Sequence, residues 1–227
     1  MNLVPLRPKL LSCRLIPHVE PALANAFGCD PKCHTSLGLV TCDQDDSLYA
    51  ALDHATKFAP VDVIYARSFY AGSTHASGPL SGEILGVIGG ADPDHVAEGL
   101  LALRQALAEE ICFYTPPGEG MPAFFPHVIS SLGRYLSQQA GLLPGQPMAY
   151  LVAPPIEATV ALDHALKNAE VRLAKFFGPP TETNFAGAYL TGELNAVEAA
   201  ARAFAEAVAE VAAHPLAAAT RPARMRR

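Results

Sequence analysis

The sequence predicts an α+β protein made of two tandem copies of one mixed unit, each a small sheet flanked by helices. Two observations support this prediction. The segment ALDHATKFAPV, which begins at Ala51, recurs as ALDHALKNAEV from Ala161. Short apolar runs typical of strands surround both segments, and each copy ends in a long Ala-rich pattern of helical period. Such self-similarity within one chain indicates a duplicated fold.

The elements of each copy follow one another in the same order. A Pro-His-Val triplet, at 17–19 and again at 126–128, follows an apolar run and precedes a short helical pattern. A strand pattern comes next, SLGLVTCD or MAYLVAPP, and then the repeated amphipathic helix. Two further strands and a closing helix complete the unit. The predicted order is therefore strand, helix, strand, helix, strand, strand, helix.

The boundaries of the copies follow from this alignment. The first copy is predicted at 10–111 and the second at 120–216, joined by the Pro- and Gly-rich segment TPPGEGMP at 115–122. Extra residues in the first copy fall mostly in the loop 67–83. The last residues, 217–227, contain four arginines and are predicted to form a disordered basic tail.

Acidic and basic residues stand four apart in the repeated helices. Asp53 and Lys57, like Asp163 and Lys167, are predicted to lie on the exposed side, opposite the apolar stripe. Such a pair stabilises a helix by about 0.3–0.5 kcal/mol. The alternative is that each lysine lies at a surface edge where neighbouring particles meet.

The composition limits the classes of function. Only 17% of the residues are charged, below the roughly 25% of an average soluble chain, while 50% are hydrophobic, which predicts buried subunit interfaces. The net charge of −6, without a long basic stretch in the body, argues against nucleic acid as a partner. No apolar run approaches the ~18 residues of a membrane span, and no secretory signal is evident. These features predict a cytoplasmic protein with no membrane partner.

Metal and catalytic patterns are weak. Cys29, Cys33 and His34 have the spacing C-x3-C-H, which matches no strong zinc motif, so loop and core thiols are the better interpretation. No nucleophile-elbow, zinc-protease or phosphate-loop motif is present. Histidines recur at matching places of both copies, which indicates a shared fold, so the chain is predicted not to be an enzyme: His18 and His127, and His54 and His164.

The repeated helix resembles the signature of bacterial microcompartment (BMC) shell domains, in which a helix ends in Lys and a strand beginning with Val follows. The segment TGELNAVEAAARAF resembles the closing strand and helix of that family. Because the Pro-His-Val unit comes first instead of last, the sequence resembles the circularly permuted, tandem-domain type over roughly 9–216. Further segments carry this resemblance: SLGLVTCDQDD, YARSFYAGSTHASGPLSGE, PMAYLVAPPIEATVALDHALK and PPTETNFAGAYLTG.

The resemblance implies a flat tile. Three two-domain chains would form a homotrimer with six similar domains, a pseudohexamer, and tiles would meet other shell proteins edge to edge around encapsulated enzymes. Lys57 and Lys167 would then lie at tile edges. The implied location is a microcompartment shell in the cytoplasm, with ethanolamine utilization as the expected pathway. The alternatives are a soluble small-molecule-binding regulator with the same tandem fold and a duplicated enzyme.

The resemblance also implies a central pore, gated by the loop 67–83, and small pores within each subunit that take up ethanolamine. The residues that would line the central pore are Tyr70, Ser73, Thr74 and His75. The residues that would bind ethanolamine are Asp45, Glu83 and Phe113, with Glu157 and Thr183 as a second tier.

The acidic residues before the first repeated helix have two interpretations. Asp43, Asp45 and Asp46 are of the type that caps a helix start. Alternatively, they form a small cationic site completed by Glu83. The resemblance separately implies zinc, with Asp46 as a possible ligand. Carboxylates alone suit zinc less well than His or Cys, and no cofactor is required for the predicted role.

Overall fold

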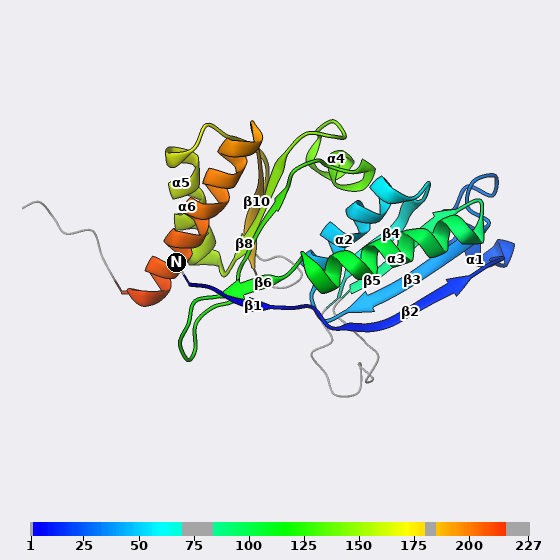
Figure 1. Cartoon of the computed structure of the whole chain (residues 1–227), viewed down its shortest axis with the longest axis horizontal. Coiled ribbons are helices and arrows are strands. Elements are labelled where there is room, and N and C mark those ends of the chain that lie inside the picture. Colours follow the sequence, from blue (N-terminus) through cyan, green and yellow to red (C-terminus); the bar gives the residue numbers. More distant parts are fainter. Residues whose placement is uncertain (1, 70–83, 180–184, 217–227) are drawn as a thin grey trace, which may run out of the picture.

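The computed structural model describes residues 2–69, 84–179 and 185–216; the predicted tail at 217–227 lies outside these ranges. Its main elements are two four-stranded antiparallel sheets, each accompanied by helices (Figure 1). The α+β class and the two-unit architecture are therefore confirmed.

The first sheet has the strand order β2-β3-β5-β4 and is antiparallel throughout. Two long helices lie side by side over one face of this sheet (Figure 1). The elements of this unit are β2 (Leu10–Ile16), α1 (Pro21–Ala26), β3 (Ser36–Cys42), α2 (Asp45–Phe58), β4 (Asp62–Ser68), β5 (Ile84–Gly90) and α3 (Pro93–Glu109).

The second sheet repeats this arrangement, with the order β7-β8-β10-β9. Helices α5 and α6 pack closely against each other and against this sheet. The elements are β7 (Phe125–Ile129), α4 (Arg134–Ala140), β8 (Met148–Ala153), α5 (Pro155–Asn168), β9 (Arg172–Phe177), β10 (Ala186–Thr191) and α6 (Leu194–Ala213). The predicted order of elements is confirmed in both copies.

Two short strands were not predicted. β1 (Val4–Leu6) pairs with β6 (Phe113–Thr115) in a separate two-stranded sheet. The guanidinium of Arg7 donates to the carbonyls of Ala108 and Glu109, at 2.9 and 3.2 Å, at the end of α3. The N-terminal segment is therefore held against the junction between the copies.

Glycines in the first sheet allow its helices to approach closely. A Cβ on Gly38 would come within 2.9 Å of the Leu100 side chain of α3, and one on Gly86 within 3.0 Å of the Leu52 side chain of α2. The absent side chains thus make room for leucines, and this close packing buries the apolar stripe predicted for α2.

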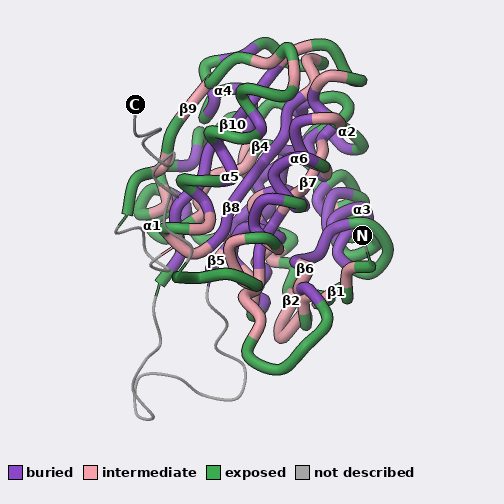
Figure 2. Tube along the Cα trace, turned by 90° about the vertical axis from the view of Figure 1, so that its left-hand side faces the viewer, coloured by how far each residue is buried: buried purple, intermediate pink, exposed green. Residues whose placement is uncertain are grey.

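The largest hydrophobic cluster is shared by the two copies. Leu48 and Leu52 of α2 belong to the same buried cluster as Phe125, Leu136 and residues of β8. Figure 2 shows this buried interior continuing through the strands and the inner sides of the helices. Because α4 also packs on α2, the two units share a core instead of meeting only through a linker. The boundaries of the two copies, 10–111 and 120–216, remain predictions.

A candidate ligand pocket between the two sheets

A pocket of about 340 Å³ lies where the start of α2 meets α4 and the second sheet. Strands β8, β9 and β10 supply seven of its fifteen lining residues, and α2 supplies two carboxylates. The residues that line it are Asp45, Asp46, Tyr49, Ala66, Tyr135, Leu136, Gln139, Tyr150, Val152, Lys175, Phe177, Phe185, Ala186, Gly187 and Tyr189.

Both carboxylates are held by hydroxyl groups. Asp45 and Asp46 retain only 6% and 8% of their surface exposed. The Ser68 hydroxyl donates to Asp45, and the Tyr150 hydroxyl donates to Asp46. The two acids are the first residues of α2, where the helix dipole favours negative charge. The pocket therefore contains two adjacent, nearly buried acids.

The capping interpretation applies to one of these residues. Asp45 accepts the backbone N–H of Asp46 at 2.8 Å, within the first turn of α2. Asp43 instead accepts the backbone N–H of Lys9 at 2.7 Å, and Gln44 occupies the N-cap position. Asp45 and Asp46 both line the pocket as well, so Asp45 combines its contact at the helix start with a place in the pocket wall.

Aromatic rings surround the acids. Tyr189 lies edge-to-face against Tyr150 and Phe177, with centroids 4.7 Å apart in both pairs. Tyr49 and Tyr135 stack at 6.5 Å. Burial, followed by the nearby Asp46 carboxylate, raises the pKa of Tyr150 and of Tyr189 well above the usual value of 10. These phenols therefore stay neutral and remain hydrogen-bond donors at physiological pH.

Of the residues predicted to bind a ligand, the structure brings some to this pocket. Asp45 and Asp46 line it, whereas Glu157, in the first turn of α5, does not. Phe113 packs on Phe185 of the lining, with centroids 6.3 Å apart, and so lies behind the pocket wall. The other predicted positions lie outside the described residues: Tyr70, Ser73, Thr74, His75, Glu83 and Thr183.

Sequence reasoning missed the tyrosines and a lysine. Tyr150 and Tyr189 stand in otherwise small and aliphatic strands, MAYLVA and AGAYLT, and this contrast was the available signal. The ammonium of Lys175 donates to the carbonyl of Gln139 at 3.1 Å and lies 5.3 Å from the centroid of Phe177. Its position on β9 did not predict a contact with α4.

The two repeated acid–lysine pairs have different environments in the structure. Lys167 forms the predicted exposed ion pair with Asp163, at 2.6 Å. The prediction that Asp53 is exposed is wrong: its side chain is completely buried and accepts the N–H groups of Gly133 and Leu136, at 2.7 and 2.8 Å. The cause is α4, which packs on α2 and needs an acceptor at its first turn.

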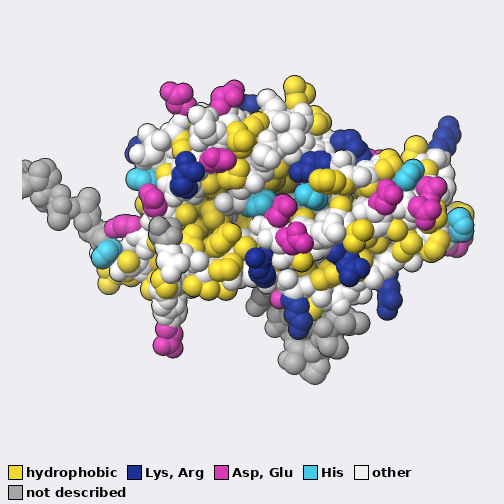
Figure 3. Space-filling model, in the orientation of Figure 1, with side chains coloured by type: hydrophobic (Ala, Val, Ile, Leu, Met, Phe, Trp, Pro, Cys, Tyr) yellow, Lys and Arg dark blue, Asp and Glu magenta, His cyan; other side chains and the backbone are white. Residues whose placement is uncertain are grey.

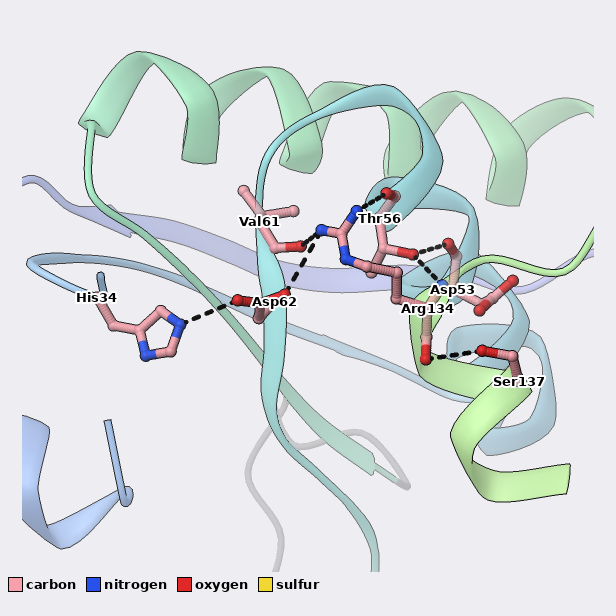
Figure 4. A network of polar contacts seen from close by, with 7 residues as sticks. All are labelled: His34, Asp53, Thr56, Val61, Asp62, Arg134 and Ser137. Atoms are coloured by element: carbon pink, nitrogen blue, oxygen red, sulfur yellow. Dashed lines mark hydrogen bonds and ion pairs between the residues drawn. The ribbon is translucent and has the colours of Figure 1, made fainter. Parts of the chain in front are cut away.

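Further polar contacts join the copies beside Asp53 (Figure 4). Arg134 donates through its guanidinium to the carbonyls of Thr56 and Val61, at 2.9 and 2.5 Å. The same group lies 3.5 Å from Asp62, which also pairs with His34 at 3.2 Å. Since Tyr135 and Gln139 of α4 line the pocket, this network fixes one side of it.

The described residues contain no group of three or more His, Cys, Asp or Glu that could hold a metal ion. His34 accepts the N–H of Asp30 through Nδ1 and contacts Asp62 through Nε2, so both ring nitrogens have protein partners. Nor does the part of the chain that the structure describes include a helix long and apolar enough to cross a membrane.

Comparison with known proteins identifies the family. No family model matches the sequence. The chain is 48% identical to the bacterial microcompartment shell protein EutL of Clostridium perfringens, over 93% of this chain and 97% of that relative. It is 44% identical to the bacterial microcompartment shell protein EutL of Escherichia coli, over 93% of this chain and 96% of that relative. It superposes on a crystal structure of Clostridium perfringens EutL with a TM-score of 0.90, covering 95% of this chain and 98% of that one.

The ethanolamine utilization protein EutL of Leptotrichia buccalis gives a TM-score of 0.91 at 46% identity, over 96% of this chain and all of that one. These relatives are shell proteins and not enzymes, as the resemblance predicted. The chain therefore belongs to the EutL family of bacterial microcompartment shell proteins.

Proposed function

We propose that the chain forms a homotrimeric, pseudohexameric tile in the shell of an ethanolamine-utilization microcompartment, with a gated central pore and small subunit pores that bind or pass ethanolamine. The observation that carries the ligand part of this proposal is the pocket with Asp45 and Asp46. The relatives' names supply the pathway.

The pocket has the groups that ethanolamine requires. An ammonium taken out of water needs a carboxylate partner, and Asp45 and Asp46 are nearly buried beside the cavity. The ligand hydroxyl needs a donor or acceptor, which tyrosine hydroxyls provide. Aromatic faces add attraction for a cation. By the resemblance, Glu83 and Phe113 would complete the site, with Glu157 and Thr183 contributing less.

Zinc at Asp46 does not suit the described residues. The side chains near Asp46 offer oxygen atoms from Asp45 and tyrosines, and neither His nor Cys lines the pocket. Oxygen ligands suit magnesium or calcium better than zinc. We therefore assign zinc no role in the binding of the ligand.

Assembly into tiles has its own support. Large apolar side chains lie exposed on the surface, among them Phe58 at 64%, Phe176 at 52% and Ile156 at 70%. Figure 3 shows hydrophobic surface between scattered charges over one face. Phe58 directly follows Lys57, so an apolar contact adjoins the proposed tile edge. Lys167 offers an exposed ammonium at the matching place of the second copy.

Light scattering after size-exclusion chromatography tests the assembly. A trimer gives a mass near 72 kDa, three times 23.9 kDa, and concentrated samples should form sheets. Lys57→Ala and Lys167→Ala should reduce sheet formation without changing the trimer mass. A single chain at high concentration would contradict the proposal.

Calorimetric titration with ethanolamine tests the pocket. Asp45→Ala and Glu83→Ala should abolish binding, because each removes a carboxylate that stabilises the ammonium. Asp163→Ala, which removes an exposed acid from the other repeat, is the matched control and should leave the affinity unchanged. Wild-type affinity in the Asp45→Ala and Glu83→Ala variants, as in Asp163→Ala, would reject the assignment.

A further inference from the structure

One face of helix α5 is exposed, although the matching face of α2 is buried. The two helices correspond in the repeat, since Ala51 of α2 aligns with Ala161 of α5. Three large apolar residues are exposed on α5, and their counterparts on α2 are buried: Ile156, Val160 and Leu166 correspond to Asp46, Ala50 and Thr56. On α2 this face lies in the junction of the two units, where α4 packs on the helix. Among the described elements, none takes the place of α4 on α5.

The helix that corresponds to α4 is α1. The last turn of each helix leads into a glycine with a positive φ, 64° at Gly141 and 75° at Gly28, so Leu23 of α1 corresponds to Leu136 of α4. Leu136 is buried in the internal junction, which is the contact of α4 with α2, whereas Leu23 is exposed. Figure 1 shows α1 and α5 at opposite ends of the molecule. These two helices can therefore meet only when two chains associate.

The caps of α1 and α4 differ as a contact between chains requires. Because the N-cap of α4 is Gly133, this helix depends on Asp53 of α2 for an acceptor. The N-cap of α1 is Glu20, whose carboxylate accepts two N–H groups of the first turn, at 2.7 and 3.3 Å. Helix α1 can thus form before a second chain binds. Asp163, the counterpart of Asp53, is left to its exposed ion pair.

A polar contact of the internal junction corresponds to an apolar pair. The N–H of Arg134 donates to the hydroxyl of Thr56 at 3.0 Å, and its guanidinium donates to the carbonyl of Thr56 at 2.9 Å. The corresponding residues are Pro21, at the start of α1, and Leu166 of α5. Proline has no N–H to donate, and leucine has no hydroxyl to accept one. Both sides of the contact therefore differ in a matched way.

A second polar contact differs in the same way. The edge strands β4 and β9 each have a bulge, and the cross-strand rows that start just after it give the correspondence: Tyr65, Val87 and Leu39 in one sheet, and Lys175, Tyr189 and Tyr150 in the other. Leu39 thus corresponds to Tyr150, whose hydroxyl donates to Asp46. The counterpart of Asp46 is Ile156, so an acid–phenol pair corresponds to an isoleucine–leucine pair.

We propose that the apolar face of α5 is a docking surface for a second molecule of the same chain, which binds it through α1 and the side of β3 that contains Leu39, as α4 binds α2. This inference rests on the proposed function, which requires a contact between chains, and it names the surfaces that meet. Leu166 lies on Pro21 of the neighbouring chain, and Ile156 lies on Leu39. Because the two surfaces differ, the contact is head to tail and can close a ring.

The first test places a charge in the proposed contact. Ile156→Asp puts a carboxylate against apolar side chains and should weaken association at least about 100-fold, because the charge loses its hydration there. Leu143→Asp is the matched control: Leu143 has the same exposed fraction as Ile156, 70%, and lies in the loop after α4, outside the proposed contact. Light scattering after size-exclusion chromatography, over a range of protein concentrations, compares the masses. Circular dichroism of both variants should match the wild type.

The second test is a cross-link between chains. The contact of Arg134 with Thr56 brings their backbones close, so cysteines at the corresponding Pro21 and Leu166 should lie within the ~7 Å between Cα atoms that a disulfide spans. The variant combines Pro21→Cys and Leu166→Cys with Cys33→Ser, since Cys33 is exposed. Mild oxidation should give bands of two and three chains on a denaturing gel, and reduction should return a single band. Each single cysteine variant should stay unlinked.

The outcomes separate this inference from the proposed function. A wild-type trimer in which Ile156→Asp keeps the mass of Leu143→Asp, and in which no cross-link forms, overturns the docking surface and leaves the homotrimer standing. Cross-linked chains in an assembly whose mass is not near 72 kDa support the docking surface and overturn the homotrimer. A chain that stays single at every concentration and forms no cross-link overturns both.

Discussion

The carboxylate of Asp53 accepts the backbone N–H of Leu136 at 2.8 Å, although 83 residues separate them in the chain. The same carboxylate accepts the N–H of Gly133 at 2.7 Å. An acid in the first repeat thus caps a helix in the second. The first amides of α4 would otherwise lack acceptors, because Gly133, at the N-cap, has no side chain.

Replacing Asp53 with Ala should destabilise the protein strongly. The change leaves at least two buried N–H groups without an acceptor and opens a cavity beside α4. We expect a loss of about 2–4 kcal/mol in the free energy of unfolding. Urea denaturation, followed by circular dichroism, measures it.

Asp163→Ala provides the matched control, because Asp163 is the repeat counterpart and forms only an exposed ion pair. It should cost less than about 0.5 kcal/mol. Similar losses for the two variants would contradict the assignment of Asp53 to the cap.

Gly133→Ala should also destabilise the junction. A Cβ at this position would lie 2.4 Å from the carbonyl oxygen of Asp53 and 2.5 Å from the hydroxyl of Thr56. Because the backbone of α2 cannot yield as a flexible side chain does, α4 must shift, and we expect a loss of about 2–3 kcal/mol. The lower denaturation midpoint should be accompanied by weaker ligand binding, since α4 lines the pocket.

Ser131→Ala is the control for this change. Its backbone carbonyl accepts from Lys57, and that contact survives the substitution. Stability within about 0.5 kcal/mol of the wild type is expected for this exposed residue. A Gly133→Ala variant as stable as Ser131→Ala would show that α4 adjusts freely.

The sequence could predict the order of the elements because hydrophobic period and repetition are local properties. β1 and β6 were missed because strands of three residues have no measurable period. Asp53 was misplaced because the repeat suggests equal environments for Asp53 and Asp163. Only the packing of α4 on α2 makes them differ.

The candidate site was predictable in part for the same reason. Asp45 and Asp46 stand together in the chain, so their clustering is visible in the sequence. Tyr150, Lys175 and Tyr189 come from three strands, and only the sheet order and the junction of the copies bring them to α2. A single sequence contains no direct record of such contacts.

Arg134→Lys should weaken the junction despite the retained charge. The guanidinium of Arg134 donates to two carbonyls, of Thr56 and Val61, in a forked geometry that a lysine ammonium cannot reproduce. We expect a loss of about 1–2 kcal/mol by urea denaturation. Arg202→Lys, at an exposed pair with Glu198, should cost under about 0.5 kcal/mol. Equal stability of both variants would mean that the paired hydrogen bonds of the guanidinium contribute nothing to the free energy of unfolding.

His127 should make stability depend on pH between about 4 and 6.5. Burial, followed by repulsion from Lys57 and His54, lowers the pKa of His127 from 6.5 to about 4. Lys57, His54 and Glu110 line the same cavity beside the ring, which stacks on Phe125. In this window the unfolded chain binds a proton at His127 that the folded protein does not bind, so stability rises with pH.

The stabilisation is therefore complete above pH 6.5 and is lost as the pH falls toward 4. The loss attributable to His127 is about 2–3 kcal/mol. His127→Phe keeps the stacking on Phe125 and removes the titrating group. As the pH falls from 6.5 to 4, the variant should therefore lose less unfolding free energy than the wild type. Parallel profiles of His127→Phe and the wild type, measured by urea denaturation from pH 4 to 7, would mean that His127 binds its proton equally well in the folded chain.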